Sequence, residues 1–141
     1  MDNSVSIIFG VPEYGWLPVS FDYQDFHLNF DASDALNDSI DELFNMVTQM
    51  QDNEVRRTTW WLEPWAYFFD LEKERQDFKL TINQTNDLHD KSADCTQLIS
   101  IIGNDKEIIE PFRIAPRQFS SQTYEENHWP FNLDKDKIQS L

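Results

Sequence analysis

Apolar and polar side chains alternate along the first thirty residues. The period of two is typical of half-buried strands. Three runs carry it: Val5, Ile7 and Phe9, then Leu17, Val19, Phe21 and Tyr23, then Phe26, Leu28 and Phe30. Pro12 with Gly15 separates the first two runs, and the polar segment Asp22 to Asp25 separates the second from the third. We expect a three-strand antiparallel meander with two turns.

The period changes between Ser33 and Gln51. Apolar residues now recur every three or four positions, at Leu36, Ile40, Leu43, Phe44, Val47 and Met50. This spacing predicts an amphipathic helix. The opposite face carries Asp34, Asp38, Asp41, Asn45 and Gln49, with Glu42 on its flank. Two starts fit: Ser33 as the N-cap, or Ser39, which Glu42 follows three residues later as in a capping box.

Strand patterns return after the helix. Val55 to Leu62, Trp65 to Leu71, and the alternating Phe78, Leu80 and Ile82 predict a second three-strand meander. Its turns fall at Glu63-Pro64 and at Glu72 to Asp77. The polar residues Thr85 to Asp94 predict an exposed loop. A short strand is then expected at Leu98 to Ile102, before Gly103.

The last third of the chain predicts one more helix. Its apolar face is Ile108, Ile109, Phe112, Ala115 and Phe119, and its cap is Asn104 or Asp105. Pro111 and Pro116 each remove an amide donor, so we expect a kinked helix, or a short helix followed by irregular chain. An apolar tail from Trp129 to Leu141 is expected to pack back on the sheet.

These elements predict an α+β fold. Its antiparallel sheet is built from two three-strand meanders separated by one amphipathic helix, with a C-terminal helix packed on the sheet. Residues 1–141 have the length of one domain, and 40% of them are hydrophobic, enough for a folded core. Cys95 is the only cysteine, and the N-terminus has no signal-peptide pattern, so we expect a cytoplasmic protein. No apolar run has membrane-spanning length.

The negative charge is concentrated in the first part of the chain. The formal net charge is −15, and no Lys or Arg precedes Arg56, whereas eleven Asp and Glu do. Nucleic acids and anionic membranes bind cationic surfaces, which argues against both as partners. A basic protein is the partner that the charge favours. The alternative is that the acidity serves only solubility.

Candidate chemistry is sparse. His27, His89 and His128 lack metal-binding spacing, Cys95 has no CxxC partner, and Asp31, Asp34 and Asp38 do not follow the calcium-loop pattern. We therefore expect no metal or other cofactor, and a solvent-facing structural role for His27. Nucleophile and phosphate-loop motifs are also missing. The sharpest enzyme hypothesis is an acid or base at Glu63, beside Trp60, Trp61 and Trp65, but we expect no enzyme.

The chain as a whole resembles a group of small acidic bacterial proteins. Some of these are immunity proteins encoded beside polymorphic or contact-dependent growth-inhibition toxins. The segments that carry the resemblance are NFDASDALNDSIDELFNMV, the Glu63-Pro64 turn between aromatic strands, and Tyr124 to Trp129 ahead of Phe131. The resemblance implies a protein that blocks a toxin domain by binding it.

The charge pattern and the resemblance give one functional expectation. The protein is a non-catalytic inhibitor whose acidic surface binds a basic toxin domain, such as a nuclease whose cleft must hold phosphates. Reversing Asp38 and Asp41 to Lys is then expected to weaken binding and leave thermal stability nearly unchanged. A structural or regulatory interaction module that self-associates, for example as a homodimer, is the alternative, and a hydrolase using Glu63 is the weaker one. The sequence leaves both monomer and homodimer open. The expected contacts are Asp34, Asp38, Asp41 and Glu42, with Trp65 and Tyr67 as exposed aromatic anchors.

Overall fold

A computed structural model describes residues 4–33, 38–62, 65–85 and 95–120, without the side chain of residue 120. Within these ranges the chain forms two antiparallel sheets and two α-helices. The N-terminal sheet contains β1 (Ser6–Phe9), β2 (Trp16–Tyr23) and β3 (Phe26–Ser33), in that order. Helix α1 (Ser39–Thr48) follows. The C-terminal sheet contains, in sequence order, β4 (Val55–Trp61), β5 (Ala66–Glu74), β6 (Asp77–Thr85) and β7 (Cys95–Gly103). A π-helical turn (Asp105–Ile109) then leads into α2 (Glu110–Ser120).

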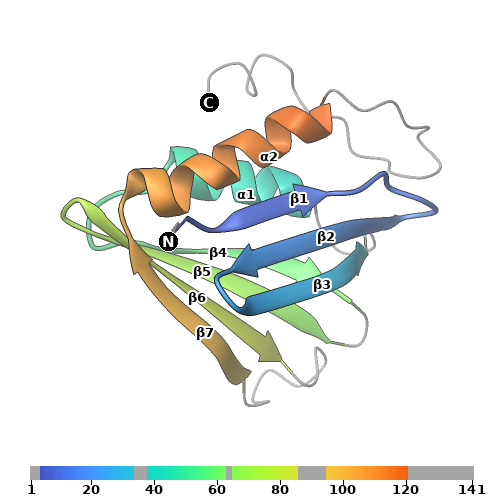
Figure 1. Cartoon of the computed structure of the whole chain (residues 1–141), viewed down its shortest axis with the longest axis horizontal. Helices are drawn as coiled ribbons and strands as arrows, with labels where there is room; N and C mark the ends of the chain where they lie inside the picture. The colour runs from blue at the N-terminus through green and yellow to red at the C-terminus, as the bar shows by residue number, and fades with distance from the viewer. Residues whose placement is uncertain (1–3, 34–37, 63–64, 86–94, 121–141) are drawn as a thin grey trace.

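The two sheets pack face to face through aromatic side chains. Phe21 of β2 lies 5.4 Å from Phe69 of β5, and Phe30 of β3 lies 4.9 Å from Tyr67, measured between ring centroids. Figure 1 shows the N-terminal sheet in front of the C-terminal sheet, with α2 running beside β1. Phe112 of α2 lies against both Phe21 and Phe69, so the helix closes the core on the β1 side.

The meanders form as the alternation predicts, and the second one continues further. Turns at Gln24 and Arg75 join β2 to β3 and β5 to β6. The predicted strand at Leu98 to Ile102 belongs to β7, which pairs with β6 and makes the second sheet four-stranded. A register shift beside Ile82 and Asn83 accompanies this pairing. The predicted loop from Thr85 begins inside β6, and residues 86–94 lie outside the described part.

Helix α1 begins between the two predicted starts, one residue before the one with Ser39 as its cap. Ser33 is a buried residue of β3, so it is not the N-cap. The N-cap is Asp38, whose backbone is extended and whose carboxylate accepts the amide of Asp41. Ser39 is the first helical residue. The prediction failed here because Ser, Asp and Asn are nearly equivalent as caps and several stand close together.

The C-terminal helix forms despite its two prolines. Asn104 is the cap, and it exchanges hydrogen bonds with Glu107 in a capping box. Pro111 cannot donate to the carbonyl of Glu107 one turn earlier. The backbone amide of Val5 donates to that carbonyl instead, at 2.9 Å. Helix α2 continues through Pro116 to Ser120, so the expectation of irregular chain after a short helix is wrong.

Candidate protein-binding surface

The first turn of α1 uses its acidic side chains within the protein. Asp38 holds the helix N-terminus through the amide of Asp41, at 3.2 Å. Burial raises the pKa of Asp38 above its usual value, and nearby Asp41 adds to the rise, although the backbone hydrogen bond opposes it. The carboxylate of Asp38 is therefore a structural cap with a desolvation cost.

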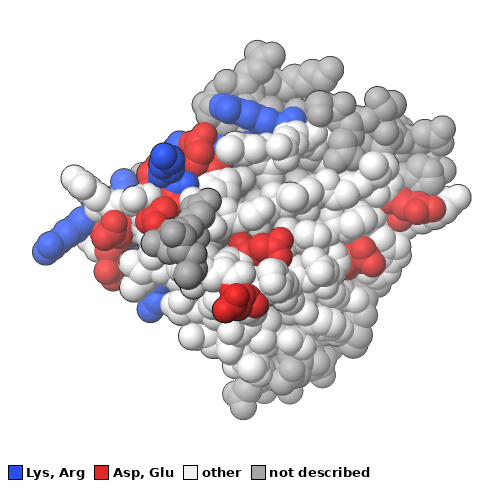
Figure 2. Space-filling model, viewed as in Figure 1, with Lys and Arg blue, Asp and Glu red and all other residues white. Residues whose placement is uncertain are grey.

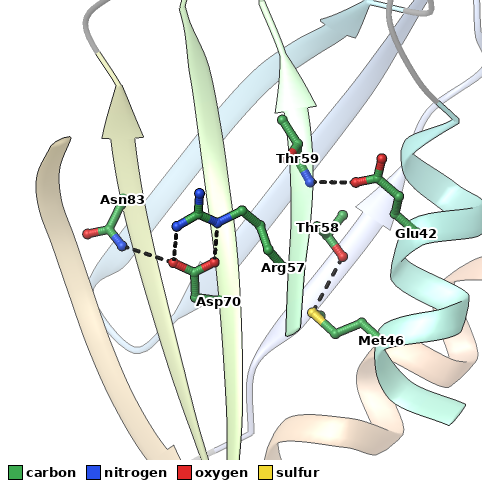
Figure 3. Close-up of polar contacts among 7 residues, drawn as sticks. All are labelled: Glu42, Met46, Arg57, Thr58, Thr59, Asp70 and Asn83. Atoms are coloured by element: carbon green, nitrogen blue, oxygen red, sulfur yellow. Dashed lines mark hydrogen bonds and ion pairs between the residues drawn. The ribbon is translucent and has the colours of Figure 1, made fainter. Parts of the chain in front are cut away.

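Ser39 and Glu42 hold the edge of the C-terminal sheet. Strand β4 is an edge strand, so every second residue has an amide and a carbonyl directed away from β5. The Ser39 hydroxyl donates to the carbonyl of Thr59 at 2.8 Å, and the Thr59 amide donates to the Glu42 carboxylate at 2.9 Å. Figure 3 shows Glu42 directed at this strand. The two residues that resemble a capping box in the sequence therefore bind the backbone of a neighbouring strand.

The remaining polar face of α1 is joined in a chain of hydrogen bonds. Arg56 donates to Gln49 at 3.2 Å, Gln49 to Asn45 at 3.4 Å, and Asn45 to Asp41 at 3.4 Å. A pocket of about 180 Å³ lies beside this chain, lined by Glu42, Asn45, Met46, Arg56 and Arg57. Because two arginines line this pocket beside one glutamate, the region is not a uniformly acidic face.

Charges on the outer face of the C-terminal sheet are also paired with one another. Arg57 of β4 makes two hydrogen bonds to Asp70 of β5, at 2.6 and 3.0 Å (Figure 3). The Arg57 guanidinium also lies 4.1 Å from the ring centre of Phe68. The hydrogen bond that Arg57 donates to Asp70 raises the pKa of Arg57 above its ordinary value. Asn83 of β6 donates to the same carboxylate at 3.3 Å. This network balances its own charge.

The predicted aromatic anchors are not free surface groups. Tyr67 is 7% exposed and packs against Phe30, so the expectation that it is exposed is wrong. Its inward position follows from strand alternation, because Tyr67, Phe69 and Leu71 share the core face of β5. Trp65 is partly buried, with its ring 4.9 Å from that of Tyr67. Asp34 lies outside the described residues.

The tryptophans around Glu63 do not form one cluster. Trp60 is fully buried between the sheets, near Phe9, Phe30 and Phe69. Its indole N–H has no hydrogen-bond partner within the described ranges. Trp61, the next residue along β4, alternates to the opposite face. Residues 63 and 64 lie outside the described part, so no geometry for a site at Glu63 follows.

The outer face of the N-terminal sheet has a different character. Residues that alternate with its core positions point away from the C-terminal sheet, and most of them are exposed. We define this outer face as Ser6, Ile8, Trp16, Pro18, Ser20, Asp22, His27, Asn29 and Asp31. Helix α2 lies along its β1 edge, where Pro111, Ile114 and Gln118 line a pocket together with Ser6 and Ile8. His27 and Asp22 are hydrogen-bonded there at 2.5 Å, the solvent-facing role expected for His27.

Exposed apolar side chains gather at this sheet. Among the described residues, seven large hydrophobic side chains are exposed, and four belong to β1, to β2 or to the connection between them. These four are Ile8, Val11, Tyr14 and Trp16. Tyr14 is 69% exposed and Trp16 is 40% exposed. Exposed aromatic groups of this kind are common anchors of protein interfaces.

The N-terminal sheet carries Asp and Glu side chains but no Lys or Arg. Glu13, Asp22, Asp25 and Asp31 belong to β2, β3 or their turns, and no Lys or Arg occurs before Arg56. Figure 2 shows separated red groups on a mostly neutral surface over β1 to β3, with the blue groups toward its margins. The face therefore combines exposed aromatic groups with dispersed carboxylates.

The sequence signal for this surface is an aromatic residue at an outward position of a strand. Alternation identifies the outward positions of β2 as Trp16, Pro18, Ser20 and Asp22, and a large aromatic residue at an outward position is the clue. The density of acidic residues along the sequence instead indicated α1 as the binding surface. That density does not show which carboxylates accept hydrogen bonds within the fold.

Neither a metal cluster nor a membrane-spanning helix is found in the described ranges. Three His, Cys, Asp or Glu side chains do not come together there in an arrangement for a metal ion. The described helices are too short or too polar to cross a membrane.

Comparison with known proteins finds no matching family model, no matching curated protein and no matching solved structure.

Proposed function

We propose that this protein binds a basic protein partner through the outer face of its N-terminal sheet and acts without catalysis. The observation that carries the proposal is the composition of that face. It holds exposed Ile8 and Trp16 together with Asp22 and Asp31, in a region of chain that has no Lys or Arg. Aromatic groups supply contact energy at such interfaces, and the carboxylates select a cationic partner.

Inhibition of a toxin domain is the role that we propose for this binding. It rests on the resemblance to immunity-type proteins and on the acidic charge. A nuclease or another enzyme that binds polyanions needs a cationic cleft, and a carboxylate-bearing surface competes for it. Opposite charge also accelerates the encounter of the two proteins.

The position of the proposed surface differs from the sequence-based expectation. Asp38 and Glu42 already accept backbone hydrogen bonds inside the fold. Withdrawing them to bind a partner would leave the amides of Asp41 and Thr59 without those acceptors, at a cost in stability. Asp31, in contrast, is an exposed residue on the outward side of β3. We therefore transfer the proposed contacts from α1 to the N-terminal sheet.

Self-association is the second candidate function, because exposed apolar residues on one face also suit a dimer. Ile8 and Trp16 supply the apolar part of such a contact. The carboxylates weigh against it. A symmetric contact across this face would bring acidic groups of two copies together without a compensating base.

A capture experiment tests the proposal. The tagged chain is immobilised and offered the cation-exchange-retained protein fraction of its host extract, at low salt and at about 0.5 M salt. We expect one basic protein to be retained, with partial loss at high salt. Retention of no basic protein contradicts the proposal, and recovery of the chain itself supports self-association instead. Activity assays of the retained protein with and without the chain then test inhibition.

A further inference from the structure

We propose that the hairpin tip between β1 and β2 inserts into the partner as its aromatic anchor. The hairpin tip is Val11, Glu13, Tyr14, Gly15 and Trp16. This inference rests on the proposed function and adds the part of the surface that enters the partner. The proposed partner has an apolar slot rimmed by Lys or Arg.

The tip is held in a defined shape by its backbone. The amide of Glu13 donates to the carbonyl of Trp16 at 2.9 Å, and the amide of Trp16 donates back at 3.0 Å. Tyr14 and Gly15 are the two turn residues, with φ angles of 50° and 85°. Positive φ at both positions is the type I′ geometry, which matches the twist of antiparallel strands.

The base of the tip is fixed as well. The Gly10 amide donates to the Pro18 carbonyl at 2.8 Å. A Cβ atom on Gly10 would lie 2.9 Å from the Cβ of Pro18, so only glycine fits this approach. Pro12, within the same connection, is buried. A tip held in this way loses little conformational freedom on binding, which favours affinity.

Tyr14 occupies a position that its side chain disfavours. The first turn residue of a type I′ hairpin is most favourable as Asn, Asp or Gly, because a Cβ atom is strained at positive φ. Gln24 and Arg75 share this strain, at φ 51° and 59°. Tyr14 differs from them in carrying a large ring that is 69% exposed, between exposed Val11 and Trp16. The turn therefore bears a strained, largely exposed residue with an aromatic side chain.

The chemistry of the tip defines the chemistry of its binding site. Val11, Tyr14 and Trp16 present apolar surface, which fits a slot rather than a flat hydrated surface. Glu13 lies in the same turn, and Asp31 faces outward two residues before the β3 partner of Trp16. These carboxylates would face the rim of the slot, which must then carry Lys or Arg. A basic cleft with an apolar floor has this combination.

Three single variants distinguish the contribution of the Tyr14 ring to binding from the effect of backbone strain in the turn. Tyr14→Asn removes the ring and relieves the turn. Gln24→Asn relieves the same strain at the opposite end of the N-terminal sheet and is the matched control. Tyr14→Phe keeps the ring. We expect Tyr14→Asn and Gln24→Asn each to raise the Tm by about 3 °C, a typical scale for such a change in a chain of this size.

The binding readout uses the basic protein fraction of the host extract. We expect the affinity for the basic protein that the unmodified chain retains to fall at least about tenfold in Tyr14→Asn. Gln24→Asn and Tyr14→Phe should bind within about twofold of the unmodified chain.

Each of the other outcomes contradicts either the tip as anchor or the proposed function. Undiminished binding by Tyr14→Asn overturns the tip as anchor and leaves the proposed function standing. A lower Tm for Tyr14→Asn overturns it too, because the ring would then serve the fold. If the unmodified chain retains no basic protein, the proposed function and this inference both fail. Recovery of only the chain itself has the same result.

Discussion

The first turn of α1 and the outer face of the N-terminal sheet both carry acidic residues, but they use them differently. In α1, Asp38 and Glu42 accept amides of the protein's own backbone, and Arg56 lies at the end of the hydrogen-bond chain that reaches Asp41. On the N-terminal sheet, Asp31 is exposed beside exposed aromatic groups. Acidic residues in a sequence therefore indicate a binding surface only where the fold leaves them directed at solvent.

The largest expected effect is the loss of binding affinity when an aromatic side chain of the N-terminal sheet is removed. Trp16→Ala should weaken binding of the retained basic protein by about 2 kcal/mol or more, roughly 30-fold, because buried tryptophans dominate interface energies. The Tm should change little, because Trp16 is partly exposed on the outward side of β2. Calorimetric titration measures the binding, and thermal unfolding measures the stability.

Ile102→Ala is the matched control for that variant. Ile102 is 72% exposed, on β7 of the other sheet. It should leave binding unchanged. Equal losses for the two variants would mean that exposed apolar groups contribute wherever they lie, which contradicts a defined binding face.

The second-largest expected effect is a loss of stability when a side chain of α1 is truncated. Glu42→Ala removes the carboxylate that accepts the Thr59 amide, so the free energy of unfolding should fall by about 1.5–3 kcal/mol. Binding of the basic partner should be unchanged in the fraction that remains folded. Glu54→Ala is the control, because Glu54 pairs with the Arg56 side chain and its loss leaves no strand amide without an acceptor; it should cost less than about 1 kcal/mol. Urea unfolding compares the two, and equal stabilities would contradict the strand-edge role of Glu42.

The smallest expected effect concerns the pH dependence of Asp38. Its pKa is raised in the folded protein, chiefly by burial, so the folded state binds the proton more readily than the unfolded state. Stability from this group is present at low pH and declines as the pH rises past the ordinary value of 3.8. Asp38→Asn keeps the cap without this decline, because Asn and Asp cap equally well.

Asp38→Asn should therefore match the unmodified protein in acid and exceed it at pH 7, by less than about 1 kcal/mol. Asp38→Ala should lose about 1 kcal/mol through loss of the cap. Chemical unfolding across the acidic range gives the comparison. A variant advantage that grows toward low pH contradicts the sign. The expectation that Asp38→Lys leaves stability unchanged is replaced by an expected loss, because the cap is destroyed.

Most of the fold could be predicted because its signals are local. The alternation at Val5, Ile7 and Phe9 and the spacing of Leu43 and Val47 depend only on neighbouring residues, and these side chains are buried as expected. The contacts that decided the remaining features join distant segments. The Val5 amide replaces the donor that Pro111 lacks, and Thr59 occupies the Ser39 and Glu42 side chains. No local pattern contains these pairings.

The candidate surface was harder to predict than the fold. Tyr67 and Trp16 are both aromatic residues in strands, and the direction of each side chain depends on which face of its sheet is covered. The alternation of β5 places Tyr67 with Phe69, which meets Phe21 of the other sheet. This sheet-on-sheet packing is what buries the ring of Tyr67 and leaves that of Trp16 exposed.

One pair of charge reversals tests the central claim most directly. Asp31→Lys lies on the outer face of the N-terminal sheet, and Asp41→Lys lies in the first turn of α1. Both change the net charge equally, and the affinity of each is measured for the basic protein retained by the unmodified chain. We predict at least about a tenfold loss for Asp31→Lys and less than about twofold for Asp41→Lys. The reverse ranking would place the interface on α1 and contradict the account.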